Sequence, residues 1–263
     1  QNKDFIVYLG DNLIKHEVED LLKQYQAQEM DALIQIKEVD DPTQFGVAEL
    51  DDNQRVIRLE EKPKEPKSNY AVVGVYIFNA KIHDQIDQLQ PSGRGEFEIT
   101  HAIQGLLDSN ANVGSNLLTG WWLDTGKKDD LLEANRIVLD ERPDESYIAS
   151  TVEVSDTSRI TGRVRILGGT KIENCIIRGP AIIGANCTLR DAYVGPYTSL
   201  GDNVELIASE IEHSIVLDRG RILNLGDRVS DSLIGENTEV TRTETRPGSF
   251  RLMLGDDSRV EFI

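Results

Sequence analysis

The sequence predicts an α/β domain followed by an all-β parallel β-helix. Strand-like and helix-like patterns alternate before residue 140, which is typical of an α/β fold. From Ile148 onward, aliphatic residues recur at spacings of six, six and five, so that three inward positions make one coil of 17 residues. The stretch between these patterns is polar and contains a proline, which predicts a linker. The predicted domains are therefore residues 1–140, the linker 141–147, and residues 148–263.

The first domain combines a βαβ unit with a hairpin. The predicted strands are residues 5–9, 32–39, 45–50, 55–59 and 70–78. The predicted helices are residues 17–28, 81–89, 96–107 and 130–138. The turn Asp51-Asp52-Asn53 joins two alternating runs, which indicates a hairpin. The last strand, residues 70–78, is almost wholly apolar, as expected for a strand buried on both faces.

The repeat of the second domain predicts stacked coils that bury one column of aliphatic side chains. The positions after Ile148 are Val154, Ile160, Ile166, Ile172, Ile177, Ile183, Leu189, Val194, Leu200, Leu206, Ile211 and Val216. Open coil ends and exposed strand edges favour assembly, so we expect a homo-oligomer, a trimer or tetramer, through the β-helix. Acyl transfer is the alternative for such a domain, with His213, its only histidine, as the base.

The composition of the chain argues against some classes of binding partner. The net charge is −18, from 28 basic and 46 acidic residues, which argues against binding to nucleic acid or to an anionic membrane surface. No apolar run is long enough to span a membrane. Cys175 and Cys187 do not form a disulfide framework, which fits a reducing cytoplasm. Because Gln1 leads directly into a buried-looking strand, we expect a fragment or a reading frame that has lost its front.

Two places in the first domain carry polar groups where a buried strand ends. Asp11 follows the first strand, where open α/β sheets bind ligands, and its carboxylate suits Mg²⁺; the alternative is a turn or helix-capping aspartate. Trp121 and Trp122 are followed by Asp124, and a tryptophan beside an aspartate at a strand end can form the floor of a sugar site, although a buried tryptophan is more often core.

A charged pair, Glu61 and Lys62, ends the second strand of the hairpin just before Pro63. The carboxylate of Glu61 can accept hydrogen bonds from sugar hydroxyls, and the ammonium group of Lys62 can neutralise a phosphate. The alternative is a solvated turn with a weak surface ion pair. On the functional interpretation, this pair suits a sugar phosphate.

Five strings in the chain resemble one family. FGVAEL, EEKPKEPKSNYAVVGVYIF, LGDN, RGEFEIT and WLDTG resemble segments of sugar-1-phosphate nucleotidyltransferases, in particular the long glucose-1-phosphate thymidylyltransferases. The resemblance implies a partial Rossmann-like nucleotidyltransferase domain, its sugar-phosphate half, followed by a left-handed β-helix. It also implies a Mg²⁺ ion held by Asp11 and Asp124. The catalytic residues it implies are Asp11, Lys62 and Asp124, and the implied substrate-binding residues are Gly46, Glu61, Lys62, Val72 and Trp122.

The reaction implied by the resemblance joins a sugar 1-phosphate to a nucleoside triphosphate. With glucose 1-phosphate and dTTP it gives dTDP-glucose and pyrophosphate; both the sugar and the base come from the resemblance alone. The family's glycine-rich triphosphate loop, GGxGTRLxPxT, does not occur in residues 1–263. We therefore expect this chain to have weak activity or none. The alternative is a catalytically silent protein that assembles through its β-helix and binds a sugar nucleotide.

Overall fold

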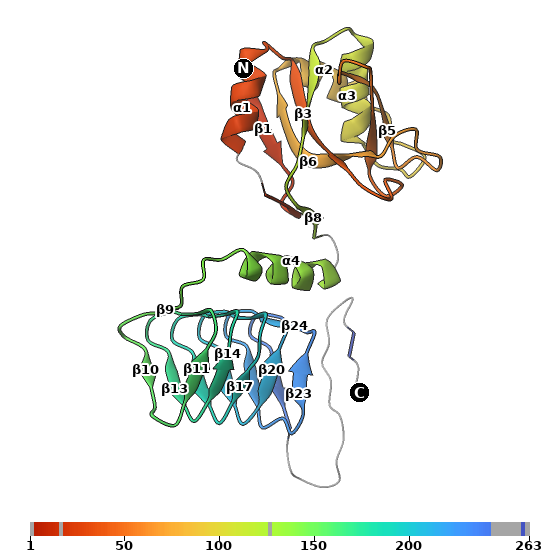
Figure 1. The fold of residues 1–263 in the computed structure, drawn as a ribbon. Helices are drawn as coiled ribbons and strands as arrows, with labels where there is room; N and C mark the ends of the chain where they lie inside the picture. Colours follow the sequence, from red (N-terminus) through yellow and green to blue (C-terminus); the bar gives the residue numbers. More distant parts are fainter. Residues whose placement is uncertain (1–2, 16–17, 126–127, 243–258, 261–263) are drawn as a thin grey trace. The chain divides into compact units, whose positions relative to one another are not determined.

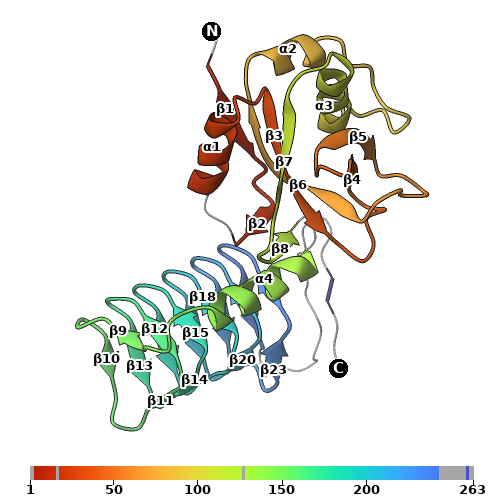
Figure 2. The same cartoon turned by 45° about the horizontal axis from the view of Figure 1, so that its top comes forward.

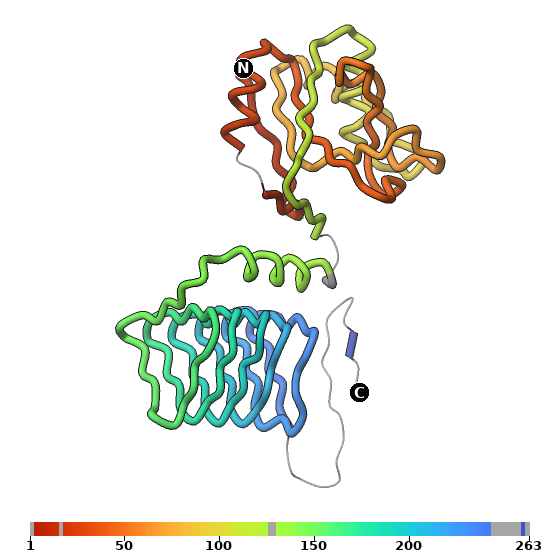
Figure 3. The backbone as a smooth tube through the Cα atoms, viewed as in Figure 1, coloured from red at the N-terminus to blue at the C-terminus, as the bar shows by residue number. Residues whose placement is uncertain are grey.

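The chain packs as two units, Gln1–Ala134 and Asn135–Ile263, seen in Figures 1 and 3. The structure is a computed structural model and describes residues 3–15, 18–125, 128–242 and 259–260. No helix in these described ranges is long and apolar enough to cross a membrane.

The first unit is built on a six-stranded mixed sheet in the order β5-β4-β6-β3-β7, with β1 also paired to β6. Its strands are β1 (Phe5–Tyr8), β3 (Ala32–Glu38), β4 (Gly46–Leu50), β5 (Val56–Glu61), β6 (Tyr70–Phe78) and β7 (Val113–Leu117). Its helices are α1 (Val18–Ala27), α2 (Lys81–Ile86) and α3 (Ile99–Asp108). A separate two-stranded ribbon joins β2 (Asn12–Ile14) to β8 (Trp122–Asp124).

Strand β6 is the centre of this unit and is buried on both faces, as its apolar sequence predicts. Val72, Tyr76 and Phe78 pack with residues of α2 and α3. Val73 and Val75 on the opposite face pack with residues of α1. Figure 2 shows α1 on one side of the sheet and the other two helices across from it.

The predicted βαβ unit is present in a modified form. Strands β1 and β3 run in the same direction, because each is antiparallel to β6. They do not pair with each other, since β6 lies between them. A long apolar strand that can take a partner on both edges explains the difference.

The second unit is a parallel β-helix, as the spacing of its aliphatic residues predicts. Its three sheets contain β9 to β25, as six, five and six strands. Their bounds are β9 (Tyr147–Ile148), β10 (Glu153–Val154), β11 (Arg159–Thr161), β12 (Val164–Ile166), β13 (Lys171–Glu173), β14 (Ile176–Arg178), β15 (Ala181–Ile183), β16 (Thr188–Arg190), β17 (Tyr193–Val194), β18 (Thr198–Leu200), β19 (Glu205–Ile207), β20 (Glu210–Glu212), β21 (Ile215–Val216), β22 (Arg221–Leu223), β23 (Arg228–Ser230), β24 (Leu233–Ile234) and β25 (Glu239–Thr241).

The aliphatic column forms the core of the β-helix. Ile166, Ile183 and Leu200 pair in register from coil to coil and are buried. At the first coil, Ile148 takes the same inward register but is 44% exposed, because no described coil covers it. The predicted left hand of the coil stays a prediction.

Helix α4 (Lys128–Asp140) leads into the β-helix. Asn135 Nδ2 donates to the carbonyl of Tyr197 at 2.9 Å, and Asn135 Oδ1 accepts from Ser199 Oγ at 2.6 Å. Tyr197 also donates its hydroxyl to Asp140 at 3.1 Å. These bonds anchor the end of α4 on the β-helix. The sequence-based bounds of 1–140, 141–147 and 148–263 stay a proposal.

Candidate active site

The candidate site lies where two strands leave the same edge of β6. Strand β1 pairs with its carboxyl-terminal half, Val75–Phe78, and β4 pairs with Tyr70 and Ala71 at the other end. Val72 and Gly74 lie between these partners. Open α/β sheets bind ligands where the order of their strands switches, so the point at which β1 and β4 diverge is the candidate position for a site.

Asp11 and Asp124 come together at the end of the β2–β8 ribbon. Asn12 faces Asp124 in this antiparallel pair, and the backbone N–H and hydroxyl of Thr125 both donate to the Asp11 carbonyl, at 2.7 and 2.8 Å. The two aspartates are thus diagonal neighbours. Among the described residues, no group of three or more His, Cys, Asp or Glu side chains is arranged to hold a metal ion by itself. Two carboxylates fit a hard divalent ion that completes its shell with phosphate and water oxygens.

Asn12 connects this ribbon to the sheet. Its side chain is 5% exposed; Oδ1 accepts from the backbone N–H of Gly74 at 3.1 Å and from Trp122 Nε1 at 2.7 Å. Its Nδ2 donates to Asp11 Oδ1 at 2.9 Å. One buried amide therefore orients the carboxylate of Asp11 and the indole of Trp122. Sequence analysis missed this residue, although its position inside the LGDN string was a signal.

The sugar side of the site gathers around Gly46. It lies opposite Glu61 in the β4–β5 pair. A Cβ atom added to Gly46 would lie 2.6 Å from Thr100 Cγ2, 3.3 Å from Glu61 Oε2 and 3.6 Å from Val72 Cβ. Two of the predicted substrate-binding residues, Glu61 and Val72, therefore lie close to a third, Gly46. The glycine is needed because a larger side chain would overlap Thr100.

Glu61 is held in place by two neighbours that sequence analysis did not assign to the site. Thr100 Oγ1 on α3 donates to Glu61 Oε2 at 2.9 Å. The guanidinium group of Arg94 approaches Glu61 Oε1 at 3.8 Å, and it also contacts Glu96 and Glu98. The string RGEFEIT contained both neighbours, and only the folded chain shows that they face Glu61.

Lys62 occupies a strained turn at the end of β5. Its φ of 41° lies in the left-handed region, and its backbone N–H donates to the carbonyl of Phe45 at 3.0 Å. A lysine in this region costs about 1 kcal/mol or more, and such strain is concentrated at functional sites. Its side chain is exposed and has no carboxylate partner among the described residues.

Tyr76 lies on β6, the strand with which both β1 and β4 pair. Its ring is 4% exposed on β6, on the same side as Val72. Burial first, and then the negative charges of Glu61 and Asp11, raise the pKa of Tyr76 above its ordinary value. Trp122, on strand β8 of the ribbon, contacts Phe45, the residue before Gly46, with ring centroids 4.8 Å apart, so the ribbon and the sugar side of the site touch each other.

Comparison with known proteins identifies the family. The model of the nucleotidyl transferase family matches residues 1–141. The chain belongs to the nucleotidyl transferase family. It is 46% identical to a glucose-1-phosphate thymidylyltransferase of Streptomyces antibioticus, over 98% of this chain and 71% of that relative. It is 43% identical to the protein of the same name from Streptomyces griseus, over 98% of this chain and 71% of the relative. It is 40% identical to the low-salt glycan biosynthesis nucleotidyltransferase Agl11 of Haloferax volcanii, over 98% of this chain and 72% of that relative.

The family confirms the resemblance and the enzyme class expected from the sequence. Nucleotidyltransferases of this kind generally use a divalent metal. In this nucleotidyltransferase the backbones of the predicted residues Asp11 and Asp124 are neighbours at the end of the ribbon, and Glu61 and Val72 both lie close to Gly46. The individual roles of these residues, and of Lys62 and Trp122, stay predictions.

Two histidines and both cysteines lie outside the candidate site, and the structure shows what surrounds each of them. His83 stacks on Phe5 with ring centroids 5.3 Å apart. Cys175 and Cys187 are buried and form no disulfide. His213 is not isolated: its Nδ1 contacts the carboxylate of Asp231. A histidine held by a carboxylate keeps its other ring nitrogen available.

Proposed function

We propose that this nucleotidyltransferase acts on a sugar 1-phosphate, that the sugar is glucose and that the base is thymine. One observation carries the proposal: Trp122, on the strand that carries Asp124, packs against Phe45, the residue before Gly46, with ring centroids 4.8 Å apart. The choice of glucose and thymine is supported by the names of the two Streptomyces relatives.

Glu61 binds the hexose in this proposal. Thr100 donates to Oε2, which fixes the carboxylate and leaves acceptor positions for two sugar hydroxyls. Gly46 lets β4 pack closely against Thr100, Glu61 and Val72, because a Cβ at this position would overlap Thr100. Trp122, oriented by Asn12, provides an aromatic surface for the apolar face of the sugar.

Lys62 neutralises the phosphate of the sugar 1-phosphate. Lys62 follows Glu61 directly in the chain, at the end of β5. The phosphate oxygen of the sugar attacks the α-phosphorus of dTTP in line, and pyrophosphate leaves as that P–O bond breaks. The charge that Lys62 offsets is present on the attacking phosphate throughout the step.

Asp11 and Asp124 would hold the divalent ion, which we propose is Mg²⁺. When bound, it offsets the negative charge of the phosphate oxygens that meet in the site. The part of this chain is to keep the two carboxylates together: the β2–β8 pair fixes their backbones, and Asn12 orients Asp11.

Calorimetry on the 263-residue chain tests the proposal. Glucose 1-phosphate, dTDP-glucose and dTTP are titrated with Mg²⁺ into the wild type and into Glu61→Gln, with Glu60→Gln as the matched control. Glu60 is the preceding residue of β5 and pairs with Arg58 instead of the site. We expect dTDP-glucose to bind, and its affinity to fall about tenfold or more in E61Q because a charged acceptor is lost.

The proposal fails if E61Q and E60Q bind dTDP-glucose equally well, or if the wild type binds none of the three ligands. UTP and dTTP in competition identify the base. If the ligands bind but pyrophosphate and dTDP-glucose give no turnover, the result matches the silent sugar-nucleotide-binding alternative.

Assembly and location complete the proposal. We propose a homo-oligomer, a trimer or tetramer, formed through the β-helix, which sedimentation equilibrium measures. The two buried cysteines that form no disulfide support a cytoplasmic location.

A second candidate function, acyl transfer, is favoured by the contact between His213 and Asp231. The carboxylate orients the imidazole, which is the arrangement of a general base. Release of thiol from acetyl-CoA, with a sugar phosphate or amino sugar phosphate as acceptor, measures this activity. A rate that is the same in the wild type and in His213→Ala excludes it.

A further inference from the structure

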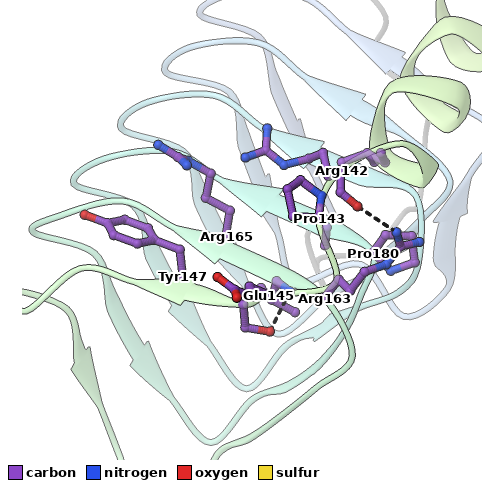
Figure 4. A pocket seen from close by; sticks show the side chains of 11 residues that line it. Arg142, Pro143, Glu145, Tyr147, Arg163, Arg165 and Pro180 are labelled. Atoms are coloured by element: carbon purple, nitrogen blue, oxygen red, sulfur yellow. Dashed lines mark hydrogen bonds between the residues drawn. The ribbon is translucent and has the colours of Figure 1, made fainter.

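A small cavity lies beside the first coil of the β-helix, wholly within the second unit. Its volume is about 220 Å³. Figure 4 shows it between the segment that follows α4 and strands β9 and β12. Three of its lining side chains are the arginines Arg142, Arg163 and Arg165. This concentration of positive charge is unexpected in a chain with a net charge of −18.

Arg163 has a structural task. Its Nη1 donates to the carbonyl of Asp140 at 2.8 Å and to that of Arg142 at 3.1 Å. It also contacts the carboxylates of Asp140 at 3.4 Å and Asp144 at 3.7 Å. A guanidinium group at the end of a helix satisfies carbonyls that have no partner within the helix. Arg163 therefore fixes the end of α4 and the wall of the cavity, and its charge is already compensated.

Arg142 and Arg165 remain without a carboxylate partner among the described residues. Arg165 faces Tyr147 across the β9–β12 pair, and its guanidinium lies 4.9 Å from the centre of that ring. Stacking on an aromatic ring holds the plane of the guanidinium and leaves its N–H groups free at the edge. In Figure 4 the side chains of Arg142 and Arg165 extend to the same side of the cavity.

One carboxylate, that of Glu145, also lines the cavity. Its residue is exposed, so water screens its charge. In the view of Figure 4 it lies on the other side of the cavity from the Arg142 and Arg165 guanidinium groups. The uncompensated balance is two cations against one exposed anion, which favours an anionic ligand.

We propose that this cavity binds a small phosphate-bearing ligand through Arg142 and Arg165. Planar guanidinium groups match the oxygens of a phosphate with paired hydrogen bonds. The volume suits inorganic phosphate, pyrophosphate or a sugar monophosphate and is small for a whole nucleotide sugar. Pro143, Pro180 and Tyr147 supply apolar wall for an organic group. All three ligands carry a phosphate group, and the titrations described next show which of them binds.

The test is calorimetric titration of the full 263-residue chain, without divalent metal, with inorganic phosphate, pyrophosphate and glucose 1-phosphate. The variants are Arg142→Gln and Arg165→Gln. The matched control is Arg178→Gln, because Arg178 also lies over a tyrosine ring, that of Tyr193, at 5.9 Å but lines no part of the cavity. We expect saturable binding of at least one ligand, about tenfold weaker in each cavity variant and unchanged in R178Q.

The variant E61Q distinguishes ligand binding at this cavity from ligand binding at the candidate active site. It leaves the affinity of the cavity for its ligand unchanged. Equal affinities in the wild type, R142Q and R165Q overturn the proposal, and so does the lack of saturable binding for all three ligands. If R142Q does not fold, R165Q decides alone, since Arg165 is an exposed, outward-facing residue of β12.

Discussion

Replacing Asn12 by alanine tests how the two halves of the site are joined. The substitution removes the acceptor of two hydrogen bonds, from the Gly74 backbone N–H and from Trp122 Nε1, and the donor to Asp11. A buried donor left without a partner costs about 1–3 kcal/mol. Because Trp122 is only half-buried and can recruit water, we expect Asn12→Ala to lower the free energy of unfolding by about 2–4 kcal/mol.

Urea unfolding followed by tryptophan fluorescence measures this loss. Both tryptophans of the chain, Trp121 and Trp122, belong to the first unit, so the signal reports that unit alone. With a slope of about 2 kcal/mol per molar urea, the midpoint should fall by about 1–2 M. Asn53→Ala, in an exposed hairpin turn, is the control. If the midpoint of N12A falls no further than that of N53A, the buried amide does not connect the ribbon to the sheet and the reasoning is refuted.

Three further predictions are tested by unfolding measurements. Gly46→Ala places a Cβ 2.6 Å from a methyl carbon on α3 and should lower the free energy of unfolding by about 1–3 kcal/mol. The control is Gly10→Ala, whose Cβ meets nothing within 4 Å, and it should leave the urea midpoint unchanged. Ile183→Ala should destabilise the β-helix by about 2–5 kcal/mol in thermal unfolding followed by circular dichroism, and Ile148→Ala, 44% exposed, by about 1 kcal/mol or less; equal losses would contradict the stacked column. Burial tends to raise the pKa of Asp31, but hydrogen bonds from a lysine and two asparagines outweigh it and lower the pKa in the folded state. This stabilisation is therefore present above the unfolded pKa of about 3.9 and is lost as the pH falls through the folded pKa, so the urea midpoint of Asp31→Asn should depend less on pH in this range than that of the wild type.

The β-helix could be predicted because its sequence pattern is local and periodic. One aliphatic residue at a fixed spacing determines each strand, and every coil repeats the same contacts, as in the register from Ile166 to Ile183 to Leu200. The exposure of Ile148 follows from the same rule, since an end coil has a neighbour on one side only.

The site was predictable only in part. Charged residues at strand ends pointed to Asp11 and Glu61, and the resemblance added Gly46, Val72 and Asp124. The partners that orient them could not be found this way: Thr100 and Asn12 act across separations of 39 and 62 residues, and no local pattern encodes such contacts. The pairing of β1 with β6 likewise depends on which strand edge is open after the sheet has formed.

Binding of Mn²⁺, used as a spectroscopic substitute for Mg²⁺ and followed by electron paramagnetic resonance with glucose 1-phosphate present, tests the site most directly. If Asp11 and Asp124 share one ion, the wild-type chain binds one Mn²⁺. Asp11→Asn and Asp124→Asn should each abolish this binding, and Asp52→Asn, in the exposed turn of the hairpin, should preserve it. Retention of the bound ion in both D11N and D124N would contradict the account.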